Sequence, residues 1–197
     1  MYDAEVDPYC YPGTAVLKNI PGIRVQAELD TFELLASAQR ADEPLPSGRL
    51  NSPHYQSIHR HLFQDVYAWA GTFRTVRIGK EGSAFCYPEH IKREMTALFA
   101  DLKSKRYLSG LPSNAFAREA AEFLATLNAI HPFREGNGRA QTTFFALLAQ
   151  RAGHPLNLDR LEAKPFMRAM IASFRGNTQL LAGEIRRLMG RDLNSRW

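Results

Sequence analysis

Cysteines and long apolar runs are scarce in this chain of 197 residues. Its two cysteines, Cys10 and Cys86, lie far apart and outside any paired motif, so we expect no disulfide framework and a reducing compartment. No apolar run approaches the ~20 residues that a membrane-spanning helix requires. Residues 1–5 are acidic and lead into no apolar stretch, so we expect no signal peptide.

Charge is not concentrated in blocks either. The chain has 25 Lys and Arg against 20 Asp and Glu, a formal net charge of +5. No dense basic block with interleaved aromatic residues occurs, so nucleic acid is not an expected partner. The mild positive charge favours anionic ligands such as nucleotides, or an acidic partner surface, although most of these side chains are expected simply to be solvated. With 45% hydrophobic residues, a single domain with a real core is predicted.

Apolar residues recur at helical spacing along most of the chain after residue 22. Residues 1–22, which hold three prolines and two glycines, predict an irregular N-terminal arm. The residues after 190 form a C-terminal tail, 191–197. Helices are predicted at about 23–41, 52–69, 88–104, 114–130, 137–151, 159–174 and 177–190. The helix at 114–130 is the most apolar, so we expect it at the centre of the domain.

Two of these helices carry apolar stripes that predict their buried faces. The stripe of the helix at 23–41 includes Leu35 and Ala38, and that of the helix at 52–69 continues to Val66. Both stripes are expected to face the core.

Residues 73–87 differ from the helical pattern. Phe73, Val76 and Ile78 favour a strand, and residues 79–82 form a turn from which the chain can return as a second strand. We interpret the segment as a short exposed hairpin, with an irregular loop as the alternative. The predicted fold class is therefore all-α, a single helical domain with one short β-hairpin.

The most informative stretch is His131–Arg139, HPFREGNGR, between two apolar helices. A helix that begins near Asn137 leaves its first N–H groups unpaired, and these donors and the positive end of the helix dipole favour phosphate. Gly136 and Gly138 permit close approach of the backbone to a ligand. Arg139 lies within the first turn, where its guanidinium can bind further phosphate oxygens.

Two further side chains in this stretch suit phosphoryl chemistry. Glu135 offers a hard oxygen ligand, and magnesium commonly binds through one or two carboxylates together with phosphates. His131 ends the preceding helix with an imidazole suited to accepting a proton from an attacking hydroxyl. Together the residues predict positioning and electrostatic catalysis of phosphoryl transfer.

Each residue of the stretch has an ordinary structural explanation when it is taken alone. A histidine at a helix end is usually a cap, a lone Glu or Arg is usually solvated, and two glycines between helices usually form a turn. The combination in this order favours the functional interpretation. A P-loop is excluded because the GK[ST] ending is absent, and a zincin because H-E-x-x-H is absent.

Residues 131–139 resemble the signature of the Fic family, H-P-F-x-[D/E]-G-N-[G/K]-R, at every fixed position. The segment 69–80, WAGTFRTVRIGK, is similar to the family's lead into its flap hairpin, and residues 7–19 are similar to the arm of bacterial members. The resemblance covers about residues 7–190. It implies a Fic domain at 23–190 and protein adenylyltransferase activity, in which AMP passes from ATP to a Ser, Thr or Tyr hydroxyl of a target protein.

The resemblance also implies a role for each residue of the signature. His131 is expected to be the general base, and Glu135 to hold Mg²⁺. The anion-binding loop around the phosphates is expected to consist of Gly136, Asn137 and Gly138, with Arg139 on the outer phosphates.

A flap at about 76–87 is expected to position the target protein by strand addition. The expected positioning residues are Ile78, Gly79, Lys80, Glu81 and Gly82. Lys80 and Glu81 at the tip are expected to select the partner by charge. The alternative interpretation is that both are ordinary solvated turn residues.

Two features depart from the family pattern. Many members carry a second arginine three residues after the first, where this chain has Thr142, so nucleotide affinity or choice is expected to differ. Autoinhibited members carry an [S/T]-x-x-x-E-[G/N] helix, and no such match occurs in this sequence. Control is then expected from a separate small antitoxin-like inhibitor protein.

The chain resembles most the Fic domains of bacterial effectors that type IV secretion delivers into host cells. This predicts a location in the bacterial cytoplasm before delivery, and a chain that is a fragment of a longer effector. One alternative is a toxin, controlled by an antitoxin, that modifies a bacterial enzyme such as a topoisomerase. Another is a target-binding Fic module with reduced or altered nucleotide transfer, an idea motivated by Thr142.

Overall fold

The structure, a computed structural model, describes residues 7–80 and 83–189. Seven α-helices, two short 3-10 helices and one hairpin occur in this part of the chain. They are α1 (Gln26–Ala41), α2 (Ser52–Phe63), β1 (Gly79–Lys80), β2 (Ser83–Ala84), α3 (Pro88–Ser104), η1 (Arg106–Leu108), α4 (Ser113–Ile130), α5 (Asn137–Ala152), η2 (Leu158–Arg160), α6 (Ala163–Phe174) and α7 (Gln179–Met189). The predicted all-α fold with a short hairpin is confirmed. The predicted tail, 191–197, lies outside the described residues.

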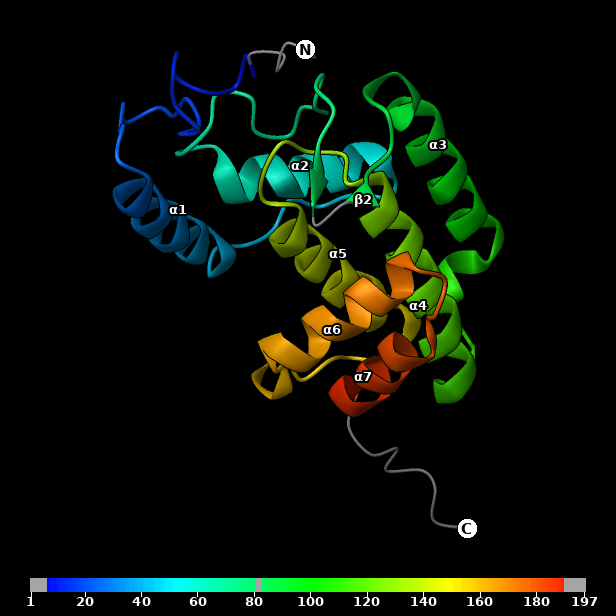
Figure 1. Cartoon of the computed structure of the whole chain (residues 1–197). Coiled ribbons are helices and arrows are strands. Elements are labelled where there is room, and N and C mark those ends of the chain that lie inside the picture. The colour runs from blue at the N-terminus through cyan, green and yellow to red at the C-terminus, as the bar shows by residue number, and fades with distance from the viewer. Residues whose placement is uncertain (1–6, 81–82, 190–197) are drawn as a thin grey trace.

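Helix α4 is the centre of the domain, as its composition predicts. It packs against α3, α5, α6 and α7, and these neighbours surround it in Figure 1. Nine of its 18 residues are buried, among them Phe116 and Leu127, both 0% exposed. Because α4 is enclosed on most sides, its C-terminal end is held firmly where the HPFREGNGR loop begins.

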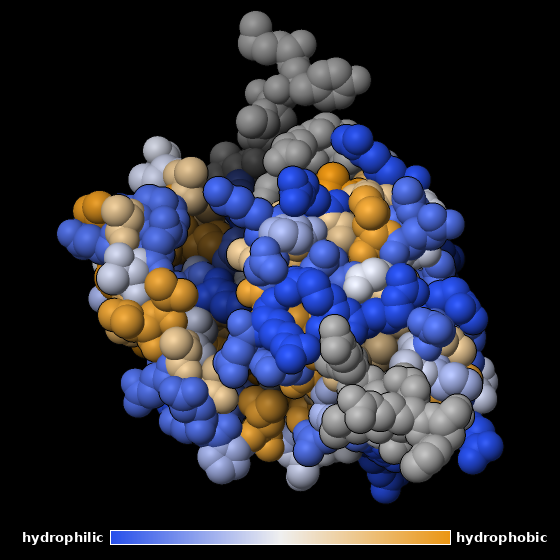
Figure 2. All heavy atoms as spheres, turned by 90° about the horizontal axis from the view of Figure 1, so that it is seen from below, coloured by the Kyte–Doolittle hydropathy of each residue, from blue (hydrophilic) through white to orange (hydrophobic). Residues whose placement is uncertain are grey.

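Helix α1 packs on α2 and uses only part of the predicted stripe, of which Phe32 packs against the core. Leu35 is 66% exposed and Ala38 is also exposed, whereas Leu29 and Ser37 are buried. Figure 2 shows apolar side chains gathered on the left, the side on which α1 lies in Figure 1. The predicted stripe is therefore wrong at Leu35 and Ala38 but not at Phe32. At the C-terminal half of α1 a polar residue, Ser37, is buried instead, and its hydroxyl accepts from Arg139 of α5.

The predicted helix at 52–69 ends early, at Phe63. Residues 64–70 instead form turns, in which Val66 is still fully buried. The Val66 carbonyl accepts a hydrogen bond from the N–H of Ile20 in the N-terminal arm, at 2.8 Å. That bond replaces the one a continuing helix would make from residue 70. Val66 is therefore buried as its stripe predicts, but it lies in a non-helical segment.

The hairpin is shorter than predicted. Its antiparallel strands pair Gly79 with Ala84 and Lys80 with Ser83, and residues 73–78 are not strand. Beyond the strands, the Cys86 N–H donates to the Ala129 carbonyl at 3.1 Å. This bond fixes the base of the hairpin to the last turn of α4.

Among the described residues, no helix combines the length and apolar character needed to cross a membrane.

Candidate active site

The loop between α4 and α5 is closed by the side chain of Asn137, the first residue of α5. Its Oδ1 accepts from the Phe133 N–H at 3.0 Å, and its Nδ2 donates to the Phe133 carbonyl at 2.8 Å. Asn137 is 3% exposed. The amide therefore shapes the loop from within, while its main-chain N–H remains at the start of the helix, where phosphate can bind.

Phe133 is a core anchor, with 0% exposure. Its ring stacks on His59 of α2, with 3.7 Å between ring centroids, and on Tyr55 at 5.4 Å. Gly136 lies next to this anchor at φ 78°, and a Cβ there would come within 2.4 Å of the Phe63 ring. Only glycine fits this position, because both the backbone conformation and the space exclude a side chain.

Gly138, unlike Gly136, has free space around it. It is exposed, and a Cβ built on it would meet no atom within 4 Å. Together with Asn137 and Arg139 it opens α5, whose first N–H groups have no partner inside the helix. The structure thus presents a row of main-chain donors to open space.

His59 supports the loop from the far side, a role that the sequence reasoning missed. Its Nδ1 accepts from the Gly71 N–H at 2.9 Å, so Nε2 carries the proton and donates to the Glu135 carbonyl at 2.9 Å. Burial lowers the pKa of His59 to about 4. The ring is therefore neutral near pH 7, and it holds the backbone of Glu135 in place. Three histidines occur on α2, so the sequence offers no signal to select this one.

His131 ends α4, and its backbone is in the left-handed conformation, with φ 48° and ψ 63°. Its Nδ1 lies 3.3 Å from the Asn128 carbonyl, and because a carbonyl only accepts, Nδ1 is the donor. In the neutral ring Nε2 then carries the lone pair, as a general base requires. Phe85, which follows β2, stacks on the imidazole at 3.9 Å with 14° between the planes.

A buried arginine that the sequence reasoning did not single out joins the hairpin base to this loop. Arg74 is 2% exposed, and its guanidinium donates to the carbonyls of His131, Val76, Cys86 and Ile130 at 2.6–3.2 Å. Burial lowers its pKa. Its charge also offsets the negative dipole end of α4. The residue lies within the segment that resembles the family, but no pattern there predicts this contact.

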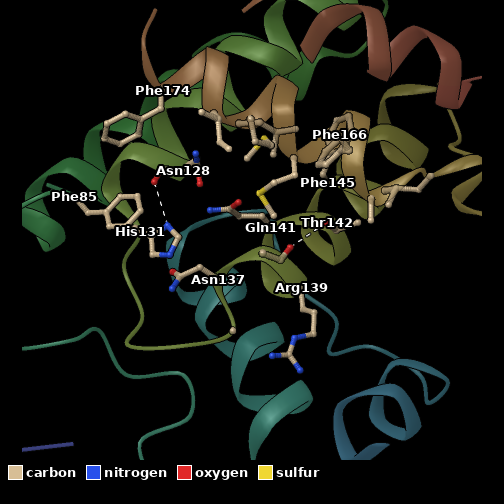
Figure 3. Close-up of a pocket in the computed structure, with 18 of the residues that line it drawn as sticks. Phe85, Asn128, His131, Asn137, Arg139, Gln141, Thr142, Phe145, Phe166 and Phe174 are labelled. Carbon is tan, nitrogen blue, oxygen red and sulfur yellow. Dashed lines mark hydrogen bonds between the residues drawn. The ribbon is translucent and has the colours of Figure 1, made fainter. Parts of the chain in front are cut away.

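Glu135 and Arg139 are both engaged by the protein. The Glu135 carboxylate is exposed, and its Oε1 accepts from the Gly136 N–H at 2.8 Å. Arg139 pairs with the carboxylate of Glu33 and donates to the Ser37 hydroxyl at 2.9 Å, both on α1. Arg139 therefore points toward α1 at the edge of the site, as Figure 3 shows.

The chemistry of the donors fits a magnesium ion only if the ligand shares in binding it. The described residues contain no group of three or more His, Cys, Asp or Glu that could hold a metal ion. One exposed carboxylate, Glu135, lies beside the anion-binding start of α5. Magnesium suits such a place, because it keeps several waters and binds through one or two carboxylates plus phosphate.

The loop opens into a cavity of about 550 Å³. One end is formed by His131 and by residues 135–139, and the other end is apolar (Figure 3). The apolar end is lined by Phe145, Phe166, Met167, Met170, Ile171 and Phe174. Thr142 also lines the cavity, and its hydroxyl donates to the Gly138 carbonyl at 3.0 Å. A flat apolar group joined to an anion matches this shape and chemistry.

A family model described as Fic/DOC matches residues 49–149. The chain belongs to the Fic/DOC family. It is 52% identical over 189 residues to a probable protein adenylyltransferase, y4lH, of Sinorhizobium fredii, covering 95% of this chain and 98% of that protein. It is 39% identical to the protein adenylyltransferase VbhT of Bartonella schoenbuchensis, covering 94% of this chain but 40% of that protein.

Solved structures support the same Fic assignment. A crystal structure of the translocated effector BepC of Bartonella tribocorum, with bound AMPPNP, has a TM-score of 0.81 at 30% identity, covering 91% of this chain and 95% of that chain. The predicted Fic fold is thereby confirmed. Because a probable protein adenylyltransferase is 52% identical to this chain over nearly its whole length, the chain is an enzyme, a protein adenylyltransferase.

The structure brings His131 and residues 135–139 together in the lining of the cavity, whereas Pro132, Phe133 and Arg134 do not line it. Their individual roles stay predictions. The expected flap residues Ile78 and Gly79 lie at the hairpin and do not line the cavity. Lys80 pairs with Ser83 through the backbone, whereas Glu81 and Gly82 lie outside the described residues.

Proposed function

We propose that this chain transfers AMP from ATP to a Ser, Thr or Tyr hydroxyl of a target protein, with magnesium bound at Glu135. The observation that carries the proposal is the convergence of the His131 ring, the Glu135 carboxylate and the N-terminus of α5 at one end of a single cavity. The hydroxyl oxygen forms a bond to the α-phosphorus, the bond from that phosphorus to the bridging oxygen of the β-phosphate breaks, and pyrophosphate leaves.

His131 takes the proton of the attacking hydroxyl on Nε2. The Nδ1 contact to the Asn128 carbonyl and the stacked Phe85 ring hold the imidazole in one orientation. A fixed base with a defined tautomer needs no rearrangement at the moment of transfer.

The first turn of α5 binds the phosphates. Main-chain N–H groups of Asn137 and Gly138 surround the anion, and the Gly136 N–H joins them by exchanging its bond to the Glu135 carboxylate for one to phosphate. Arg139 adds charge toward the outer phosphates. Glu135 would hold the magnesium ion, which would supply positive charge against the negative charge of the leaving group. The apolar end of the cavity, at α6, takes the base.

The hairpin lies beside His131 through Phe85 and is the element nearest to an incoming hydroxyl. We propose that an extended target segment pairs with the flap at residues 78–82, which includes β1, and thereby presents its hydroxyl to the base. Charges at the tip, Lys80 and Glu81, then favour one partner over another.

The likeness to Bartonella effectors named as translocated supports a target in a host cell and delivery through type IV secretion. Thr142 leaves the cavity without a cation at the position of the family's second arginine. This supports control by a small antitoxin-like inhibitor rather than by a glutamate of the chain's own, because such a glutamate would lack its ion-pair partner.

The test uses ATP that carries a radioactive α-phosphate, incubated with the protein, Mg²⁺ and either host-cell or bacterial lysate. We expect a labelled protein band in host lysate that the His131→Ala variant does not produce. A band in bacterial lysate alone would favour the toxin alternative. No band in either lysate, with a target still captured by the protein, would favour the binding module.

A further inference from the structure

One side-chain amide in the wall of the cavity has a nitrogen without a hydrogen-bond partner among the described residues. Gln141, on the second turn of α5, is 4% exposed, and no hydrogen-bond partner for its Nε2 exists within the described structure. The side chain lines the cavity. In Figure 3 its amide points toward the space between Asn128 and His131.

An unpaired buried amide is costly and therefore uncommon. An unbranched apolar side chain such as methionine has nearly the same length and would fit a wall that already contains Met167 and Met170. The unpaired amide of Gln141 therefore lowers the stability of the ligand-free protein. A ligand atom that pairs with the amide explains that cost.

The position of Gln141 identifies which part of a nucleotide it meets. Four residues of α-helix advance about 6 Å, so Gln141 lies about one turn beyond Asn137 and the phosphate-binding start of α5. On its other side begins the apolar end of the cavity, lined by Met170 and Phe145. The piece of a nucleotide between its phosphates and its base is the sugar.

The chemistry of an amide suits this partner. A sugar hydroxyl both donates and accepts, so either end of the Gln141 amide can pair with it. The next residue, Thr142, has a hydroxyl, but that hydroxyl already donates to the Gly138 carbonyl at 3.0 Å. Gln141 is thus available for the ligand, while Thr142 is engaged by its own helix.

We propose that Gln141 recognises the sugar of the bound nucleotide through a hydrogen bond to a ribose hydroxyl, and so selects ribonucleotides over deoxyribonucleotides. The proposal rests on the proposed function, in which an adenine nucleotide occupies this cavity. Gln141 acts here in binding and specificity, and it takes no part in proton transfer.

The experiment measures dissociation constants by calorimetry for ADP, 2′-deoxy-ADP and 3′-deoxy-ADP. The variants are Gln141→Met, which keeps length and removes the amide, and Gln141→Asn, which keeps an amide that does not reach. Gln150→Met is the matched control, because Gln150 is exposed on the same helix. Thermal unfolding without nucleotide is measured for every variant.

We expect the natural protein to bind ADP about tenfold more tightly than one of the two deoxy analogues. Both Gln141 variants should bind ADP about tenfold more weakly than the natural protein does. Their dissociation constants for ADP and for the deoxy analogues should differ by less than about twofold. Without nucleotide, the unfolding temperature of Gln141→Met should equal or exceed that of the natural protein, because the variant lacks the unpaired amide. Gln150→Met should match the natural protein.

Two results overturn the inference while leaving the proposed function intact: no discrimination by the natural protein, or natural discrimination kept in both Gln141 variants. Failure of the natural protein to bind any of the three nucleotides would overturn the nucleotide site itself, and the sugar contact with it.

Discussion

Arg139, in the first turn of α5, forms an ion pair with Glu33 of α1, and the Tyr67 hydroxyl donates to the same carboxylate. The Glu33 side chain is 12% exposed. Burial, and then the neighbouring Glu33, raise the pKa of Tyr67, so the phenol stays protonated and remains a donor. The cation expected to bind outer phosphates is therefore already balanced by a carboxylate that repels them.

Glu33→Gln should therefore tighten ATP binding by about fivefold, because it removes a like charge. Its amide keeps one oxygen to accept from Arg139, and its NH2 group can donate to the Tyr67 hydroxyl. Calorimetric titration with ATP at low salt measures the effect, which should shrink as salt is added. Glu28→Gln, at an exposed position of the same helix, is the control. Weaker ATP binding by Glu33→Gln would mean that the pair orients Arg139 toward the phosphates instead of opposing them.

Glu135→Gln should raise the magnesium concentration for half-maximal transfer by more than about tenfold, since an amide is a poor ligand for a hard cation. The substitution keeps an oxygen that can accept from the Gly136 N–H, so the loop should survive and the unfolding temperature should change little. A magnesium titration of the AMP-transfer rate provides the readout, with Glu89→Gln, exposed at the start of α3, as control. An unchanged titration curve would remove Glu135 from the metal site.

His59 makes stability depend on pH in a defined window. Burial lowers its folded pKa to about 4, against about 6.5 in an unfolded chain. As pH falls below about 6.5 only the unfolded state takes up the proton, so stability is lost progressively down to about pH 4, by about 3 kcal/mol in all. At pH 7 the contribution is complete.

Urea unfolding of the natural protein and of His59→Gln between pH 7 and pH 4.5 tests this effect. The variant should be less stable at pH 7 but should lose less stability on acidification. His90→Gln, exposed on α3, should follow the natural curve. Parallel pH curves for the natural protein and His59→Gln would show that His59 does not stay neutral when folded.

Arg74→Met should lower the free energy of unfolding by about 3 kcal/mol, because carbonyls of the hairpin base and of α4 lose their donor. Arg74→Lys keeps the charge but not the forked geometry, so its loss should be intermediate. Arg77→Lys, which keeps a cation over the Tyr87 ring, serves as control. Chemical unfolding at pH 7 gives the values. An Arg74→Lys variant as stable as the natural protein would limit the role of Arg74 to its charge.

Much of the candidate site was predictable because His131 and residues 135–139, which line the cavity, lie within nine consecutive residues. Asn137 and Gly136 share one loop, so a motif captures them together. The central position of α4 was also predictable, since an apolar helix buried on most sides leaves a strong periodic signal.

The supporting residues were not predictable, because their contacts cross long stretches of sequence. Glu33 reaches Arg139 from α1, His59 reaches Glu135 from α2, and Phe85 reaches His131 from the hairpin. Periodicity also placed Leu35 and Ala38 of α1 in the core, where they do not lie. It counts apolar residues, whereas polar residues such as Glu33 make that helix's contacts with the site.

The most direct test of the account is a crystal structure with a non-transferable α,β-methylene analogue of ATP and Mg²⁺. We predict the triphosphate at the N-terminus of α5, the α-phosphorus facing the His131 ring, the metal between Glu135 and the phosphates, and the base at the apolar end beside α6. A triphosphate bound elsewhere, with the His131 ring turned away from the α-phosphorus, would contradict the account.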